Sequence, residues 1–179
     1  DTSFDLEPLV FKSLKKKLPE LRDAIDGYIT PEQAGKLKVI KTHYEDLESR
    51  KAELEELILA LAAPYQQELA ILQTAPGISS DFTAIGIISE IGTNMEAFPS
   101  AKHLCSWAGL TPTNNESAGK KKSVRVSKAG CYIKPLLVQC ANAVIKSTKH
   151  PEMRNRYLRL KKRRGHKKAI IAIARMLLT

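Results

Sequence analysis

Residues 68–92 read ELAILQTAPGISSDFTAIGIISEIG, and this stretch decides the fold of the second half of the chain. Two apolar runs with helical spacing flank a tight turn at Pro76, Gly77 and Ile78. The pattern is typical of a helix-hairpin-helix motif, in which backbone N–H groups at the start of the second helix bind an anion such as a DNA phosphate. We expect Gly77 and Ile78 to form such a contact, with Gly77 leaving room for the phosphate. A turn that joins two core helices is the alternative.

Upstream of this motif the sequence predicts one long helix. A hydroxyl cap at Thr30, a proline at the next position and Gln33 together form a helix start signal. The spacing of the apolar residues that follow is that of a coiled-coil seam, interrupted at Lys51. Residues 30–74 are therefore expected to form a helical arm, and Pro64 to kink or end its helix. The seam residues are Leu37, Ile40, Tyr44, Leu47, Leu54, Ile58, Leu61 and Tyr65.

These patterns predict an all-α chain with a long coiled-coil helical arm and a compact helical domain that contains the helix-hairpin-helix motif. Residues 1–29 would form a linker with short helices, residues 30–74 the arm and residues 75–179 the compact domain. A coiled-coil arm implies a homodimer or a higher oligomer, whereas an amphipathic helix on a core is the alternative. Because the chain begins at Asp1 rather than at Met, we expect a fragment of a longer protein.

Neither a membrane span nor a signal peptide is recognisable in the sequence, so a cytoplasmic protein without membrane partners is expected. The three cysteines, Cys105, Cys131 and Cys140, are widely spaced. Their number and spacing favour reduced, buried thiols over a zinc site or a disulfide framework.

Positive charge is concentrated in the last third of the chain. The sequence has 29 basic and 19 acidic residues, which gives a net charge of +10. Residues 1–75 have 10 basic and 14 acidic side chains, residues 76–116 have 1 and 4, and residues 117–179 have 18 and 1. The last segment thus has a net charge of +17, which favours a polyanionic partner, and nucleic acid more than a membrane. A solvated basic surface is the alternative.

Two segments hold most of the excess cations. The loop TNNESAGKKKSVRVSKAG, residues 113–130, mixes three serines with basic residues. The segment RNRYLRLKKRRGHKK, residues 154–168, has nine cations in fifteen residues. The nucleic-acid contacts expected in these segments are Lys120, Lys121, Lys122, Arg125, Ser127, Lys128, Arg154, Arg159, Lys161, Lys162, Arg163, Arg164 and Lys167.

The serines of the first segment raise a question of chemistry. A serine hydroxyl is a poor nucleophile unless a base or a metal takes its proton, and no histidine lies in the loop. Cations around a phosphodiester would stabilise the charge that develops when a hydroxyl attacks it. The missing base could come from metal-bound carboxylates on another domain. Serines that cap turns or touch phosphate in a binding loop are the alternative.

From residue 76 to residue 179 the chain resembles the C-terminal domain of the insertion-sequence 110/116/902 transposase family. The matching elements occur in the family's order and at about its spacing, and the preceding arm is similar to the coiled coil that the family has there. The elements are PGI and EIG in residues 76–92, FPSAKHLCSWAGLTP in residues 98–112, Glu116, Ser117 and Gly119, SKAG in residues 127–130, and the basic segment with the apolar helix after it.

The resemblance implies that Ser117 is the catalytic nucleophile, which attacks a DNA strand and forms a phosphoserine link. It also implies DNA and a structured guide RNA as partners, in the nucleoid of a prokaryote. The family's other catalytic half is an N-terminal RNase-H-like domain with four acidic residues (DEDD) that bind a divalent metal, here expected to be Mg²⁺. The sequence begins after the place where that domain would end. We therefore expect neither a metal site nor a cofactor in this chain. We also expect the chain to bind nucleic acid but not to recombine DNA unaided.

Two other functions fit the same sequence. One is a non-catalytic helix-hairpin-helix module that binds nucleic acid, because the turn at residues 76–78 needs no catalytic serine. The other is a coiled-coil dimeriser with an incidental basic tail. Loss of nucleic-acid affinity with added salt would separate the binding functions from the dimeriser.

Overall fold

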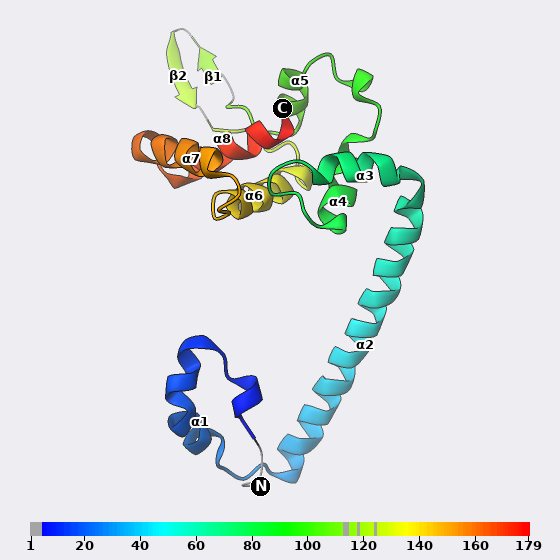
Figure 1. The fold of residues 1–179 in the computed structure, drawn as a ribbon, viewed down its shortest axis with the longest axis vertical. Helices are drawn as coiled ribbons and strands as arrows, with labels where there is room; N and C mark the ends of the chain where they lie inside the picture. The colour runs from blue at the N-terminus through cyan, green and yellow to red at the C-terminus, as the bar shows by residue number, and fades with distance from the viewer. Residues whose placement is uncertain (1–4, 113–114, 118, 124) are drawn as a thin grey trace. The chain divides into compact units, whose positions relative to one another are not determined.

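The computed structural model describes residues 5–112, 115–117, 119–123 and 125–179, with the backbone alone in residues 115–117 and 120–123. The described residues are predominantly helical (Figure 1), which confirms the all-α class for the bulk of the chain. The chain divides into two compact units, residues 1–59 and residues 60–179. None of the helices in the described residues has the length and apolar character needed to cross a bilayer.

The first unit consists of short helical pieces and most of one long helix, α2. The predicted start signal of α2 is confirmed as a reciprocal capping box. The hydroxyl of Thr30 accepts a hydrogen bond from the N–H of Gln33 at 3.2 Å, and the side-chain oxygen of Gln33 accepts one from the N–H of Thr30 at 2.9 Å. The elements are two 3-10 helices, Glu7–Leu9 and Lys12–Lys17, then α1, Leu18–Ile25, and α2, Pro31–Ala62.

The helix α2 ends where the sequence predicted. It is followed by a 3-10 turn, Ala63–Tyr65, that contains Pro64, since proline cannot continue the hydrogen-bond ladder of an α-helix. All eight seam residues are exposed in the single chain, from 37% for Ile58 to 68% for Leu61. The helix is therefore present with its apolar seam uncovered, and the coiled-coil pairing stays a prediction.

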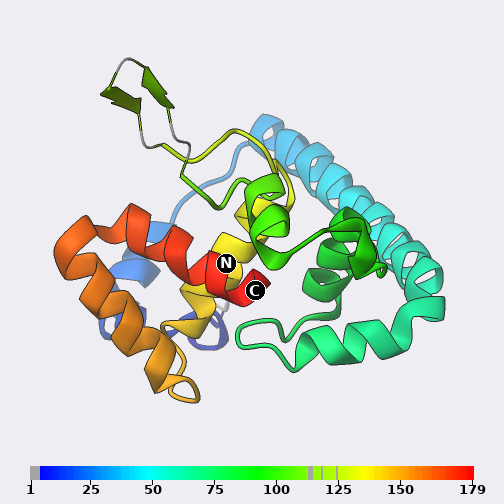
Figure 2. The ribbon, with the colours of Figure 1, turned by 90° about the horizontal axis from the view of Figure 1, so that it is seen from above.

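The second unit is a cluster of six helices around one core. The helices α6 and α8 pack along each other, α4 packs on α6, and α7 packs on α8 (Figure 2). Their apolar faces meet at Ile87, Ile133, Leu137 and Ile173, each of which is almost fully buried. The helices are α3, Gln66–Gln73; α4, Asp81–Ile91; α5, Ala101–Trp107; α6, Ile133–Val144; α7, Pro151–Arg164; and α8, His166–Leu178.

A small hairpin lies where the sequence was interpreted as a loop. Its strands are β1, Asn115–Ser117, and β2, Lys120–Ser123, and they pair antiparallel with an irregularity between Asn115 and Glu116. Gly119, with φ of +72°, lies in the turn between them. Glycine adopts this conformation without a Cβ clash, which allows so tight a connection. The hairpin is the one departure from helix among the described elements.

Candidate nucleic-acid interface

The predicted nucleophile lies at the tip of the hairpin. Ser117 is the last residue of β1, and its backbone pairs with Lys120 at the start of β2. A position next to a tight turn is a position that an extended partner can reach. The side chains of Ser117, Lys120, Lys121 and Lys122 lie outside what the structure describes, so the roles predicted for them stay predictions.

The base of the hairpin is closed by two glycines that cross at close range. Gly109 and Gly130 both have φ of +65°. A Cβ at Gly109 would overlap the carbonyl oxygen of Ala129, and a Cβ at Gly130 would overlap the carbonyl oxygen of Ala108. The outgoing and returning chains are thus in backbone contact, and each glycine is required by its neighbour. This reciprocal contact, here called the glycine crossing, fixes where the hairpin leaves the core.

Lys134, in the first turn of α6, adds a side-chain anchor at the same place. Its Nζ donates a hydrogen bond to the carbonyl oxygen of Ser127 at 2.6 Å. The hydroxyl of Ser127 accepts a hydrogen bond from the N–H of Ala129 at 3.3 Å, so this serine caps a turn. The sequence analysis assigned Ser127 to nucleic acid and left Lys134 out. The signal for Lys134 was a single lysine in the otherwise apolar run IKPLLV.

Arg125 and Lys128, two further predicted contacts, lie on the segment that follows β2 and leads back to α6. Arg125 and Lys128 are both exposed, on either side of a bridge between Pro112 and Val126. They flank the stem of the hairpin, above the glycine crossing. The cations of residues 125–128 therefore lie on the path from the core to Ser117.

The turn at Gly77 faces the core. Gly77 has φ of +83°, and a Cβ there would lie 2.6 Å from the carbonyl oxygen of Cys140 and 3.2 Å from the Cβ of Val144. Ile78 is 2% exposed, and its N–H donates to the carbonyl of Ala75 at 3.2 Å. The structure thus gives both residues a packing role against α6, which the sequence analysis kept as the alternative. A phosphate contact at this turn stays untested.

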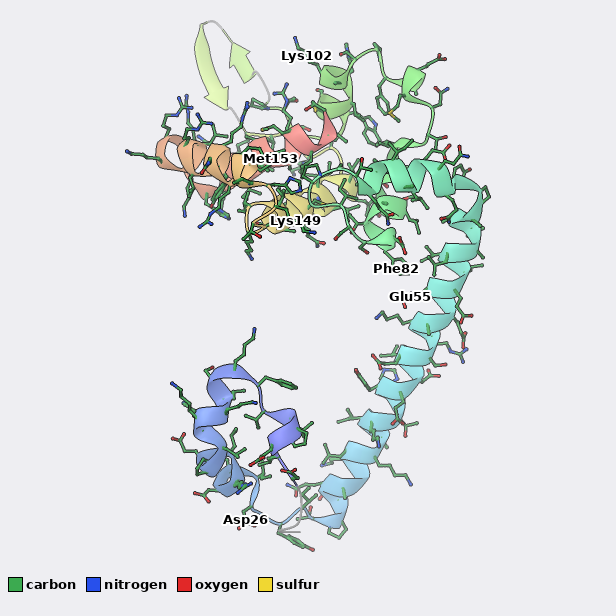
Figure 3. The ribbon with its side chains drawn as sticks, in the orientation of Figure 1. Asp26, Glu55, Phe82, Lys102, Lys149 and Met153 are labelled. Atoms are coloured by element: carbon green, nitrogen blue, oxygen red, sulfur yellow. The ribbon has the colours of Figure 1, made fainter. Side chains whose placement is uncertain are left out.

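The basic segment forms a pair of helices, α7 and α8, joined at Gly165 with φ of +80°. All nine of its cations are exposed, and none of them forms an ion pair with a carboxylate in the described part of the chain. In Figure 3 nitrogen-tipped side chains gather around α7, near the labelled Met153. Unpaired cations at this density leave a strong positive potential on the helix pair.

A polar contact holds the two basic helices together. The hydroxyl of Tyr157 lies 2.8 Å from Nδ1 of His166, and the two rings meet edge to face with their centroids 5.9 Å apart. The Nζ of Lys161 lies 5.8 Å from the centre of the Tyr157 ring. Tyr157 is 8% exposed, so it connects the core to the basic surface.

The predicted contacts gather at one end of the second unit. In both views the hairpin lies nearer to α7 than to α3 and α4 (Figures 1 and 2). Gly77 and Ile78, by contrast, lie in the turn that faces the core, where a Cβ at Gly77 would meet α6.

Metal ligands and thiols add little to this interface. No group of three or more His, Cys, Asp or Glu side chains that could hold a metal ion occurs among the described residues. All three thiols are free; Cys105 and Cys140 are buried as predicted, but Cys131 is exposed. Burial raises the pKa of Cys105, opposed by nearby Arg175, and burial also raises the pKa of Cys140.

Comparison with known proteins gives the family. Searches among curated proteins and among solved structures gave no match to the chain. The sequence model of the Transposase IS116/IS110/IS902 family matches residues 69–158, which is half of the chain. The matched region runs from α3 into α7 and contains the whole hairpin with its glycine crossing. The chain therefore belongs to the IS116/IS110/IS902 family of transposases.

Proposed function

We propose that this chain supplies the serine nucleophile and much of the DNA-binding surface of a transposase. The observation that carries the proposal is the position of Ser117 at the tip of a hairpin whose base is fixed by backbone contacts. The uncompensated cations of α7 lie at the same end of the unit and supply attraction for a phosphate backbone.

The proposed step is a transesterification. The Oγ of Ser117 attacks a DNA phosphorus, a bond forms between them, and the bond from phosphorus to one deoxyribose oxygen breaks. The hydroxyl proton passes to a base, and the leaving oxygen takes up a proton. Because one phosphodiester replaces another, the serine link conserves the energy needed to rejoin the strand to a new end.

The partners belong to the same proposal. They are DNA, a structured guide RNA, and a second copy of the chain paired through the seam of α2. The Mg²⁺ and the proton acceptor would come from an acidic domain of the kind that the resemblance to the family implies. The setting proposed for this reaction is the nucleoid of a prokaryotic cytoplasm.

The test replaces Ser117 by alanine in the protein as its gene encodes it, with Ser123→Ala, in the partner strand β2, as the matched control. We expect Ser117→Ala to remove recombination and the covalent protein–DNA adduct seen on a denaturing gel. The DNA affinity should stay within about twofold, since a serine that reacts without binding tightly contributes to the transition state and little to the ground state. Ser123→Ala should recombine normally.

Two outcomes would reject the nucleophile role. An adduct that persists in Ser117→Ala would assign the chemistry to another residue. Wild-type protein that binds DNA but forms no adduct with any substrate would favour the non-catalytic module, which the turn-capping role of Ser127 already makes a concrete alternative.

A further inference from the structure

The helix α7 has two faces of different character. Met153, Tyr157 and Leu160 are spaced by four and three residues and pack against the core cluster. This spacing puts them on one side of the helix, because each residue advances about 100° around the axis. The opposite side of α7 points away from the core and α8.

The residues at the centre of the outer face have a distinctive composition. Asn155, Leu158, Arg159 and Lys162 are spaced as i, i+3, i+4 and i+7, so they form one stripe along the helix, within about 60° of the direction opposite the core. All four are exposed. Leu158 is 47% exposed and is not part of the core cluster. Leu158 therefore gives the outer face an apolar group that the core cluster does not use.

Cations border this stripe on both sides. Arg154 and Lys161 lie along one edge, and Arg156 and Arg163 lie along the other, each about 100° from the outward direction. All four are exposed and lack a carboxylate partner among the described residues. The helix therefore presents an amide, an apolar group and two cations between two rows of cations, one of which also has Glu152 in the first turn.

Duplex DNA has the complementary arrangement. Its major groove is about 12 Å wide, admits an α-helix, and is bordered by phosphates on both sides. Asparagine can pair with adenine, arginine with guanine, and an apolar side chain can contact the methyl group of thymine. A helix of fourteen residues is about 21 Å long, enough to cross several base pairs. A-form RNA has a deep, narrow major groove that a helix does not enter in this way.

We propose that α7 is a recognition helix that inserts into the major groove of duplex DNA. Asn155, Arg159 and Lys162 then face base edges, Leu158 faces a thymine methyl group, and the bordering cations bind the two phosphate backbones. The inference rests on the DNA binding proposed above and adds direct reading of base sequence by the protein itself. The contact between Tyr157 and His166 holds this helix at a fixed position on α8.

The experiment uses the full chain and a library of duplex DNA with random sequence, from which bound molecules are selected and sequenced. Asn155→Ala and Leu158→Ala are compared with Gln67→Ala, an exposed polar residue of α3. We expect the wild type to select a short motif, and each of the first two variants to lose discrimination at one base pair by about 5- to 100-fold. Gln67→Ala should select the wild-type motif.

A second pair of variants tests the phosphate contacts separately. Arg156→Gln with Arg163→Gln should weaken binding to all sequences alike and lower the slope of log affinity against log salt by about 1.8, since each phosphate contact contributes about 0.9. Lys146→Gln with Lys149→Gln, two exposed lysines between α6 and α7, is the charge-matched control and should leave the slope nearly unchanged.

The outcomes distinguish this inference from the function on which it rests. Loss of affinity in the double variant without any base preference in the wild type would overturn the recognition helix and leave backbone binding intact. Tighter binding of a matched duplex RNA that depends on Asn155 would also overturn it. Unchanged affinity and salt slope in the double variant would remove α7 from the proposed DNA interface altogether. Melting temperatures close to wild type show that the exposed substitutions leave the fold intact.

Discussion

The side-chain nitrogen of Lys134 lies 2.6 Å from the carbonyl oxygen of Ser127, which ties the first turn of α6 to the base of the serine hairpin. We predict that Lys134→Met, which keeps the length and apolar stem of the side chain, frees this carbonyl. The charged hydrogen bond is half-buried, so its loss should cost about 1 kcal/mol of unfolding free energy. Urea denaturation measures this, and hydrogen exchange should show faster exchange in residues 119–128.

Lys146→Met is the control for that change, because it removes a cation from an exposed position beyond the other end of α6. Equal effects of the two substitutions on stability and exchange would mean that general charge, not the anchor, accounts for the result. In the protein as its gene encodes it, Lys134→Met should also slow adduct formation at Ser117 more than it weakens DNA binding. This split is the signature of a positioning residue.

Gly77→Ala tests why the turn between α3 and α4 has a glycine. Alanine there must adopt positive φ and place its Cβ 2.6 Å from the carbonyl oxygen of Cys140. Gly92→Ala is the matched control, since Gly92 has φ of +71° but no atom within 4 Å of its Cβ position. The strain of an alanine at positive φ should lower the unfolding free energy of both variants by about 1–3 kcal/mol. The clash with Cys140 should lower that of Gly77→Ala by about 1–3 kcal/mol more.

Chemical denaturation of both glycine variants decides between packing and phosphate binding at this turn. A Gly77→Ala protein as stable as Gly92→Ala, but with much weaker DNA binding, would support the phosphate contact that the sequence pattern indicates. A large loss of stability supports the packing seen against α6.

The exposed seam of α2 predicts self-association. Leu47→Lys places a charge in the middle of the seam, and it should shift an oligomer toward monomer because a lysine at a central seam position disfavours close pairing. Val39→Lys is the control, because Val39 is 70% exposed but lies off the seam. Sedimentation equilibrium over a range of concentrations measures the change. A wild type that stays monomeric at the highest concentration would contradict the coiled coil.

The buried thiols predict how stability depends on pH. Because burial raises the pKa of Cys105 and Cys140 in the folded chain, folding favours their neutral form. This contribution is fully present below the unfolded thiol pKa of about 8.5, and it is lost as the pH rises through the higher folded values. We expect the unfolding free energy to fall across this alkaline range.

Cysteine variants separate the thiols from other alkaline titrations. Cys140→Ala should flatten the alkaline loss, because it removes one of the two buried thiols whose pKa burial raises. A thiol reagent at neutral pH should label Cys131 first in the native protein. Similar labelling rates at all three cysteines would contradict the burial.

Local signals in the sequence predicted the helices well, because the residues that decide them are neighbours in the chain. The capping box at Thr30 and the end of α2 before Pro64 follow from contacts within a few residues. The hairpin was missed because its strands are three and four residues long and its residues are mostly polar, which gives no apolar alternation to detect.

The features that the sequence did not predict depend on contacts between residues that are not neighbours in the chain. The phosphate contact predicted at Gly77 rests on a local motif and stays a prediction, whereas the atom that crowds a side chain there belongs to Cys140, more than sixty residues away. Lys134 and Ser127 are close in sequence, yet only the folded path of the chain shows that the side chain of one reaches the backbone of the other. In α7 the sequence analysis counted the cations but did not place them around the helix axis.

The glycine crossing has a consequence for how the segment between Gly109 and Gly130 can be replaced. Because Gly109 and Gly130 meet in backbone contact, the chain leaves and rejoins the helical domain at one place, where buried Leu110 and the bond from Lys134 to Ser127 attach it further. We expect a segment of different length or sequence to fit between these attachments while the helices keep their packing, because the described residues beyond them are not part of the core cluster. A chimaera with this segment from a relative would show whether the activity proposed for Ser117 moves with the segment.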